Sequence, residues 1–162
     1  MKKILLFATI AIGLLAACSE NKIIIDETHT FADSKWQRFE PEVFKFDIND
    51  TAACYDIYFN FRIDTATFRS DNLPFICTLV EREDYKRTLT TEIAIRDKRG
   101  IWLGTPVGQF YEYRRKVREY FFFNAKGPHE LQVKNGSQFL EAAGFISFGI
   151  KIEKVNMDLK IE

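Results

Sequence analysis

The sequence predicts an all-β fold: a single jelly-roll-like β-sandwich of about eight antiparallel strands. Aromatic residues make up 15% of the 162 residues and include 16 Phe, and such residues favour pleated, half-buried surfaces. Apolar and polar residues alternate in several segments, as expected of strands with one buried face. Turn-forming clusters separate these segments at short intervals, and no segment has the apolar period of an amphipathic helix.

The first half of the chain begins without clear periodicity and then becomes strongly alternating. Residues 23–25, all Ile, either begin a strand or pack as an arm, and no period is evident from there to Pro41. A strand is expected over 44–48, where the even-numbered residues are apolar, and a turn at 49–50. The clearest strand is Tyr55–Ile63, in which the odd-numbered positions are apolar.

The second half continues the pattern, and the strands expected there lie at residues 73–80, 89–96, 111–123, 131–133 and 146–153. The run 73–80 is apolar on both sides, so both of its faces are expected to be buried. Residues 97–100 form a tight turn, and 100–108, which holds three glycines, is expected to be a loop. Gly127-Pro128 and Asn135-Gly136 are further turn signals.

The N-terminus has the pattern of a lipoprotein signal peptide. Two lysines precede an uncharged segment, Ile4–Ala17, which is shorter than the roughly 20 residues that span a bilayer. Ala16 and Ala17 stand directly before Cys18, as in the bacterial lipobox, where the cysteine is lipidated and the chain is cut before it. We therefore expect a signal peptide at 1–17, a lipidated tether at 18–22 and a β-sandwich domain at 23–162.

The residues after Cys18 indicate where the lipid would hold the protein. Two or three acyl chains anchor a protein stably to a membrane. Ser19 follows the cysteine, which by resemblance to lipoproteins of double-membraned bacteria favours the outer membrane. Glu20 is a lone acid beside Asn21 and Lys22, unlike the acidic clusters of surface-export signals. The expectation is a cell-envelope protein on the outer membrane that faces the periplasm.

Composition argues against several classes of function. Lys+Arg and Asp+Glu both number 23, and loss of residues 1–17 removes two lysines and leaves a net charge of −2. No basic field is therefore available for nucleic acid. His29 and His129 are isolated and give no zinc spacing, and no nucleophile motif or phosphate-binding loop is present. We expect no catalytic, cofactor-binding or metal-binding residue, and thus no enzyme.

Two cysteines remain after the anchor. Cys54 belongs to the polar face of its strand and is expected to be half-exposed, whereas Cys77 lies in an apolar run and is expected to be buried. Thiols on opposite faces are hard to bring within disulfide geometry. Two free thiols are the expectation, with a disulfide as the alternative that an oxidising compartment permits.

Two side chains are candidate ligand or partner contacts. Trp102 lies in the glycine-rich loop and is the natural aromatic platform for a carbohydrate, although a Trp in a loop also serves as an anchor packed against the sandwich edge. Arg114 lies in the basic-aromatic run 111–120, which is either a solvated strand face or a partner-binding face, since Arg and Tyr are favoured at interface hot spots.

The chain resembles one known family in the order and spacing of its motifs. These are Phe44-x-Phe46-x-Ile48-x-Asp50, Tyr55–Arg62, Asn72-Leu73, Asp97-x-x-Gly100-x-Trp102-x-Gly104, Gly108, Tyr113-Arg114, Gly127, Leu131, Leu140, Gly144 and Gly149–Lys154. Together they are similar to the GldH gliding motility lipoproteins of Bacteroidota. The resemblance covers Cys18 to Lys154.

This resemblance implies an envelope lipoprotein associated with a gliding apparatus whose machinery overlaps with type IX secretion. It supplies no catalytic residue, and only Cys18 is carried over, as the lipid-bearing residue. The leading hypothesis is a membrane-anchored, non-catalytic interaction component with protein partners in an envelope complex. The alternative is a carbohydrate- or peptidoglycan-binding β-sandwich module.

Overall fold

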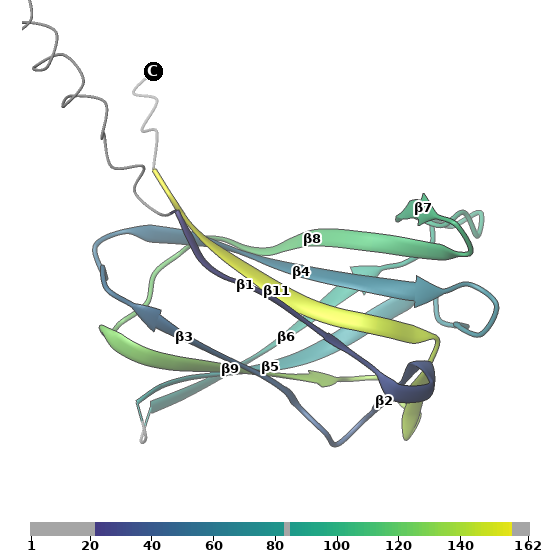
Figure 1. Cartoon of the computed structure of the whole chain (residues 1–162), viewed down its shortest axis with the longest axis horizontal. Helices are drawn as coiled ribbons and strands as arrows, with labels where there is room; N and C mark the ends of the chain where they lie inside the picture. Colours follow the sequence, from purple (N-terminus) through teal and green to yellow (C-terminus); the bar gives the residue numbers. More distant parts are fainter. Residues whose placement is uncertain (1–21, 83–84, 157–162) are drawn as a thin grey trace, which may run out of the picture.

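Eleven antiparallel strands and one short 3-10 turn make up the computed structural model, which describes residues 22–82 and 85–156 (Figure 1). The elements are β1 (Ile23–Thr30), η1 (Ala32–Ser34), β2 (Lys35–Gln37), β3 (Glu42–Ile48), β4 (Cys54–Asp64), β5 (Asn72–Arg82), β6 (Tyr85–Ala94), β7 (Thr105–Val107), β8 (Phe110–Phe121), β9 (Gly127–Asn135), β10 (Glu141–Ala143) and β11 (Phe145–Val155). The predicted signal peptide and Cys18 lie outside the described residues.

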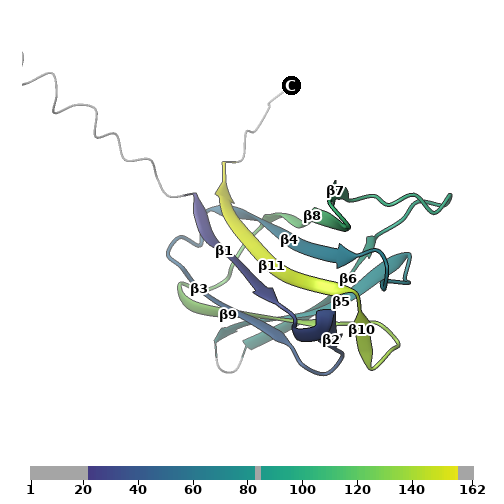
Figure 2. The same ribbon diagram turned by 45° about the vertical axis from the view of Figure 1, so that its right-hand side comes forward.

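The strands form two facing layers with a small ribbon at one end (Figures 1 and 2). One layer has the order β1-β11-β4-β8-β7 and the other has the order β3-β9-β5-β6, while β2 pairs with β10. The predicted all-β sandwich is therefore confirmed. Eight of the described strands are long, and all of these except β1 contain an alternating or apolar segment that the sequence analysis expected to be a strand. The other three have only three residues each, too few for a period to be visible in the sequence.

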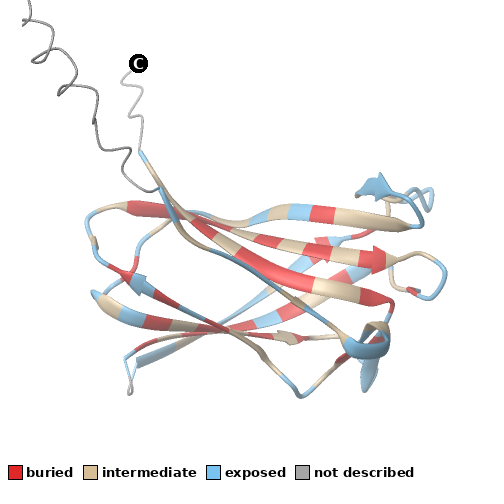
Figure 3. Ribbon diagram, viewed as in Figure 1, coloured by how far each residue is buried: buried red, intermediate tan, exposed pale blue. Residues whose placement is uncertain are grey.

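The core lies between the layers and consists largely of aromatic rings contributed by alternate strand positions (Figure 3). Phe59 and Phe61 of β4 are 1% and 3% exposed and point toward Phe75 of β5. The Phe59 and Phe75 ring centroids are 5.4 Å apart in an edge-on arrangement. Trp36 of β2 packs edge-on against Phe145 and closes the core at the ribbon.

Several sequence expectations are corrected by the pairing of the strands. The run 73–80 buries only one face, because it forms a middle strand whose other face is exposed, and Ile76 is 39% exposed there. The expected loop at 100–108 contains β7, which pairs with β8. Gly127-Pro128 begins β9 instead of forming a turn, and residues 23–25 begin a true strand.

Irregularities in the pairing also change which side chains face the core. A register shift lies between Phe145 and Ser147, so Phe145 is buried and Ile146 is only half-buried. A second irregular region lies in β4, where residues 54–57 are all buried. The expectation of a half-exposed Cys54 is therefore wrong: its thiol is buried and donates to the Val155 carbonyl at 3.3 Å.

Cys54 and Cys77 are both free and buried thiols. They lie in different layers, Cys54 at the start of β4 and Cys77 in the middle of β5. Burial raises the pKa of the Cys77 thiol to about 12. A thiol with such a pKa is protonated and unreactive at neutral pH.

The two ends of the sandwich contain different elements. One end, here called the tether end, is where β1 begins, β11 ends, and the connections 49–53 and 122–126 join the layers (Figure 1). The register supports this placement, because Val155 pairs with Cys54 and Tyr55 pairs with Phe121. At the far end lie β2, β7, β10 and the loop that contains Trp102 (Figure 2).

His29 links the edge strands of the two layers. Its Nδ1 is 2.5 Å from Glu42 of β3, its Nε2 is 2.9 Å from Glu27 of β1, and its ring stacks on Phe44. Burial lowers the pKa of His29, but the hydrogen bonds to Glu27 and Glu42 outweigh it and raise the pKa above its ordinary value. The protonated histidine therefore stabilises the contact between β1 and β3.

Truncation of a core ring is the first test of this register. We expect Phe61→Ala to lower the free energy of unfolding by about 3–5 kcal/mol, because it removes a buried ring and leaves a cavity. Chemical denaturation measures the change, with Phe39→Ala as the control, since Phe39 is 70% exposed. A loss below about 1 kcal/mol for Phe61→Ala would show that this face of β4 is not core.

The His29 contact makes stability depend on pH. Because the folded pKa is raised, its contribution is complete below the unfolded value of 6.5 and is lost as the pH rises through the folded value. The free energy of unfolding should therefore fall more steeply between about pH 6 and pH 8 in the parent protein than in His29→Gln. Equal slopes in parallel denaturation series would contradict this role.

Candidate interaction surfaces

Trp102 lies at the far end in the loop between β6 and β7, and it is partly buried against its own chain. The Arg96 guanidinium lies over the indole ring, 3.9 Å from its centroid, and the Tyr111 ring stacks on it at 5.4 Å. Arg96 is held in turn by Asp71 at 3.0 Å. This geometry fits the loop anchor of the two alternatives, because the chain's own side chains already stack on the indole.

Arg114 is exposed on β8, on the outer face of the five-stranded layer. Its guanidinium lies 5.2 Å from the ring centroid of Tyr58, which Lys116 and Lys151 also approach, at 5.6 and 5.8 Å. The three cations come from β8 and β11 and gather around one ring of the strand between them. The basic-aromatic run is thus one row of a charged sheet face, in which acidic side chains accompany the basic ones.

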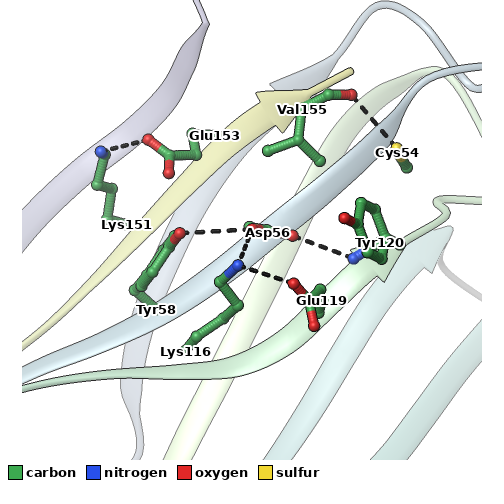
Figure 4. A network of polar contacts seen from close by, with 9 residues as sticks. All are labelled: Cys54, Asp56, Tyr58, Lys116, Glu119, Tyr120, Lys151, Glu153 and Val155. Atoms are coloured by element: carbon green, nitrogen blue, oxygen red, sulfur yellow. Dashed lines mark hydrogen bonds and ion pairs between the residues drawn. The ribbon is translucent and has the colours of Figure 1, made fainter. Parts of the chain in front are cut away.

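A buried carboxylate, Asp56, organises the tether end of this face (Figure 4). Asp56 is 4% exposed and lies 2.5 Å from the Lys116 ammonium. It also accepts hydrogen bonds from the backbone N–H of Tyr120 at 3.1 Å and from the Tyr58 hydroxyl at 3.4 Å. Hydrogen bonds to Asp56 and then to Glu119 raise the pKa of Lys116, so the ammonium stays charged and neutralises the buried acid.

This network could not be predicted from the sequence, because Asp56 occupies an ordinary polar position in the alternating strand. The pairing of β4 with β8 is irregular around Tyr55, Ile57 and Tyr58. At that irregularity Tyr120 takes a φ of +50°, a left-handed conformation that is uncommon for residues other than Gly and Asn. The carboxylate of Asp56 holds the backbone in this conformation.

A shallow polar hollow lies further along the same face, around Asn60 of β4. Its lining includes hydroxyl and guanidinium groups from five strands. These belong to Thr28, Arg62, Thr105, Arg114 and Ser147. The Asn60 carboxamide oxygen is buried and accepts no hydrogen bond from the part of the chain that the structure describes. The hollow is thus lined by polar groups from several strands, and Arg114 belongs to its lining.

The far end exposes an apolar patch, made by Phe39, Phe139 and Leu140. These side chains are 70%, 55% and 68% exposed. The two segments lie side by side, because the Arg38 N–H donates to the Leu140 carbonyl at 2.8 Å. Exposed apolar patches on soluble domains mark interaction sites. Neither segment has a periodicity in the sequence, so only the pairing of β2 with β10 brings the patch together.

The remaining candidate groups have structural surroundings. His129 is 3% exposed, its Nδ1 lies 2.9 Å from the Gly127 carbonyl, and its ring packs against Phe46 and Phe123. Among residues 22–82 and 85–156, no group of three or more metal-ligating side chains occurs, and no helix is long and apolar enough to cross a membrane.

Comparison with known proteins identifies the family. The profile of the GldH lipoprotein family matches residues 23–152, which is nearly all of the described sandwich. A search of curated proteins found no match. The matched region includes the long strands, the Trp102 loop and the Asp56 network. The chain therefore belongs to the GldH lipoprotein family.

Proposed function

We propose that this protein is a lipid-anchored, non-catalytic interaction component of a gliding or type IX secretion-associated complex in the cell envelope. Family membership supports a gliding-motility-associated lipoprotein. The lipobox before Cys18 supports lipid attachment at that residue. Ser19 after the cysteine favours the outer membrane, and the single acid near it favours the periplasmic side.

The observation that carries the proposal is the apolar patch of Phe39, Phe139 and Leu140 at the end opposite the tether. β4 has 11 residues, and a rise of about 3.3 Å per residue gives a sandwich about 35 Å long. A patch at that end is available to another envelope protein while the lipid holds the domain at the membrane. Confinement to a surface raises the effective concentration of partners, so individual contacts need not be tight.

A non-catalytic role is supported by what the buried charged groups do. Asp56 is bound by Lys116 and the Tyr120 backbone. Glu81, 3% exposed, accepts from Arg87 at 2.6 Å and from the Asn124 backbone at 3.1 Å. Each carboxylate accepts a hydrogen bond from a backbone N–H near the end of β8 and so stabilises that stretch of backbone. Neither carboxylate is paired with a nucleophile.

The polar hollow around Asn60 favours a second candidate function, carbohydrate or peptidoglycan binding. Sugar hydroxyls both donate and accept, so they suit a hollow lined by Asn60, Arg62, Arg114 and two Thr hydroxyl groups. Titration of the protein with peptidoglycan fragments separates the two candidates. Saturable binding that Asn60→Ala abolishes would favour this function over a protein partner.

Loss of the anchor should abolish function without affecting the fold. Mass spectrometry of the envelope protein should show an acylated N-terminal Cys18. Cys18→Ser, at matched abundance, should fail to complement a deletion strain, because the domain is no longer held at the membrane. Full complementation by Cys18→Ser would show that the tether is incidental.

Substitutions of the two histidines serve as the matched control for that experiment. His29→Gln and His129→Gln, if folded and anchored, should complement almost normally, because no reaction depends on them. A folded and anchored variant of this kind that failed to complement would reveal an active site and contradict the non-catalytic proposal.

Disruption of the far-end patch should break the partner contact. We expect the double change Phe139→Asp and Leu140→Asp to abolish both complementation and envelope crosslinks formed from a photo-reactive group at Phe39. Thr90→Asp is the control, because Thr90 is exposed on β6, away from the far end. Full complementation by the double variant would show that the partner does not depend on this patch.

A further inference from the structure

Apolar side chains are exposed at the tether end as well as at the far end. Ile23, Tyr85, Tyr120 and Phe122 are 47%, 45%, 48% and 42% exposed. They come from β1, β6, β8 and the connection after β8, and the strand register places all four at the end where the sandwich begins. These residues come from separate segments of the sequence, and the pairing of the strands brings them to this end.

The backbone is held so that the aromatic run at the end of β8 splits between core and solvent. Phe123 is 2% exposed and contacts Tyr55, while Phe121 is partly buried. Tyr120 and Phe122 point outward and are largely exposed. The left-handed φ of Tyr120 produces this arrangement, and Asp56 fixes it through the Tyr120 N–H (Figure 4).

Such a conformation is unfavourable in a residue other than glycine and persists only where the surroundings enforce it. Here the enforcing group is itself a buried carboxylate, which needs Lys116 for neutralisation. The protein therefore uses a buried ion pair and a strained residue to hold an exposed tyrosine. Backbone strain of this kind is concentrated at functional sites.

Basic side chains surround these exposed aromatic residues. Four exposed cations lie at or beside the same end: Lys22, Arg82, Lys86 and Lys126. Acids also lie at this end: Asp50 is paired with Lys154 at 3.1 Å, Glu119 is paired with Lys116 at 3.1 Å, and Asp47 is exposed. Aromatic side chains together with Lys and Arg are typical of protein surfaces that contact lipid headgroups.

The length of the tether requires this end to stay near the bilayer. Residues 19–22 are all that separates Cys18 from Ile23, where β1 begins. Fully extended, this segment spans about 17 Å. A lipid on Cys18 thus keeps Ile23 close to the headgroups and within reach of other contacts from the same end.

We propose that the tether end is a membrane-contact surface, on which Tyr120 and Phe122 insert among lipid headgroups and the surrounding lysines and arginines bind anionic lipid. This inference rests on the proposed lipid attachment at Cys18. The sandwich then stands on the membrane in one orientation. Its far-end patch of Phe39, Phe139 and Leu140 faces away from the bilayer.

The test uses the full, acylated protein reconstituted into vesicles of phosphatidylethanolamine and phosphatidylglycerol. A fluorescent dye is attached at Lys126→Cys at the tether end or at Val107→Cys at the far end, while the native Cys54 and Cys77 are buried and stay unlabelled. Brominated lipids should quench the dye at position 126 and leave the dye at position 107 unquenched. Equal, weak quenching at both positions would overturn the proposal.

A double variant separates specific contact from tethering alone. Tyr120→Asn keeps a residue that tolerates positive φ, and together with Phe122→Ser it should reduce the quenching at position 126 severalfold. Phe39→Ser at the far end is the matched control and should leave the quenching unchanged. Thermal unfolding verifies that each variant is folded. Unchanged quenching in the double variant would overturn the aromatic contact.

Vesicle flotation, measured on the same samples, distinguishes failure of this inference from failure of the anchor. A parent protein that does not float with the vesicles refutes lipid anchoring and this proposal together. A protein that floats but whose position 126 is not quenched refutes only the membrane contact. In that case the tether end is free to bind a protein.

Discussion

The packing of aromatic rings between two antiparallel layers is the constraint on which the rest of the structure depends. Phe59, Phe75 and Phe148 meet at centroid separations of 5.1–5.4 Å, and Trp36 packs against the last two of them at the ribbon. Rings of this size bury a large area each and add specific edge-on contacts. Their alternation along each strand fixes the register, since a slip by one residue would turn every ring toward water.

Where the alternation fails, the molecule acquires its distinctive features. In β4, residues 54–57 are all buried, so Asp56 is buried although it lies on the outer face of the layer, and it requires Lys116. At the same irregularity Tyr120 takes a left-handed conformation and part of the aromatic run points outward. A buried polar residue on the central strand of the layer thus influences which aromatic side chains stabilise the core and which are available at the surface.

The two ends of the sandwich expose different kinds of side chain, as expected of a protein whose ends contact different surroundings. The end where β1 begins combines exposed aromatic and basic side chains, whereas the far end has an apolar patch and a packed tryptophan loop. Between them lies a charged sheet face with mutually compensating ions. These two surfaces are the basis of the proposal that one end lies at the membrane and the other end binds a partner.

The sequence by itself determined the fold class, seven of the eight long strands and the family, because period-two alternation and turn residues act locally and survive folding. It also indicated the lipidation motif at Cys18. It failed where contacts between distant segments decide the outcome: the burial of Cys54 and the three short strands. It left two alternatives for Trp102, between which the contacts of Arg96 and Tyr111 with the indole decide. The Asp56 network and both exposed patches join residues from different segments, and only the tertiary structure brings these together, because strand register is set by the whole core and not by any local motif.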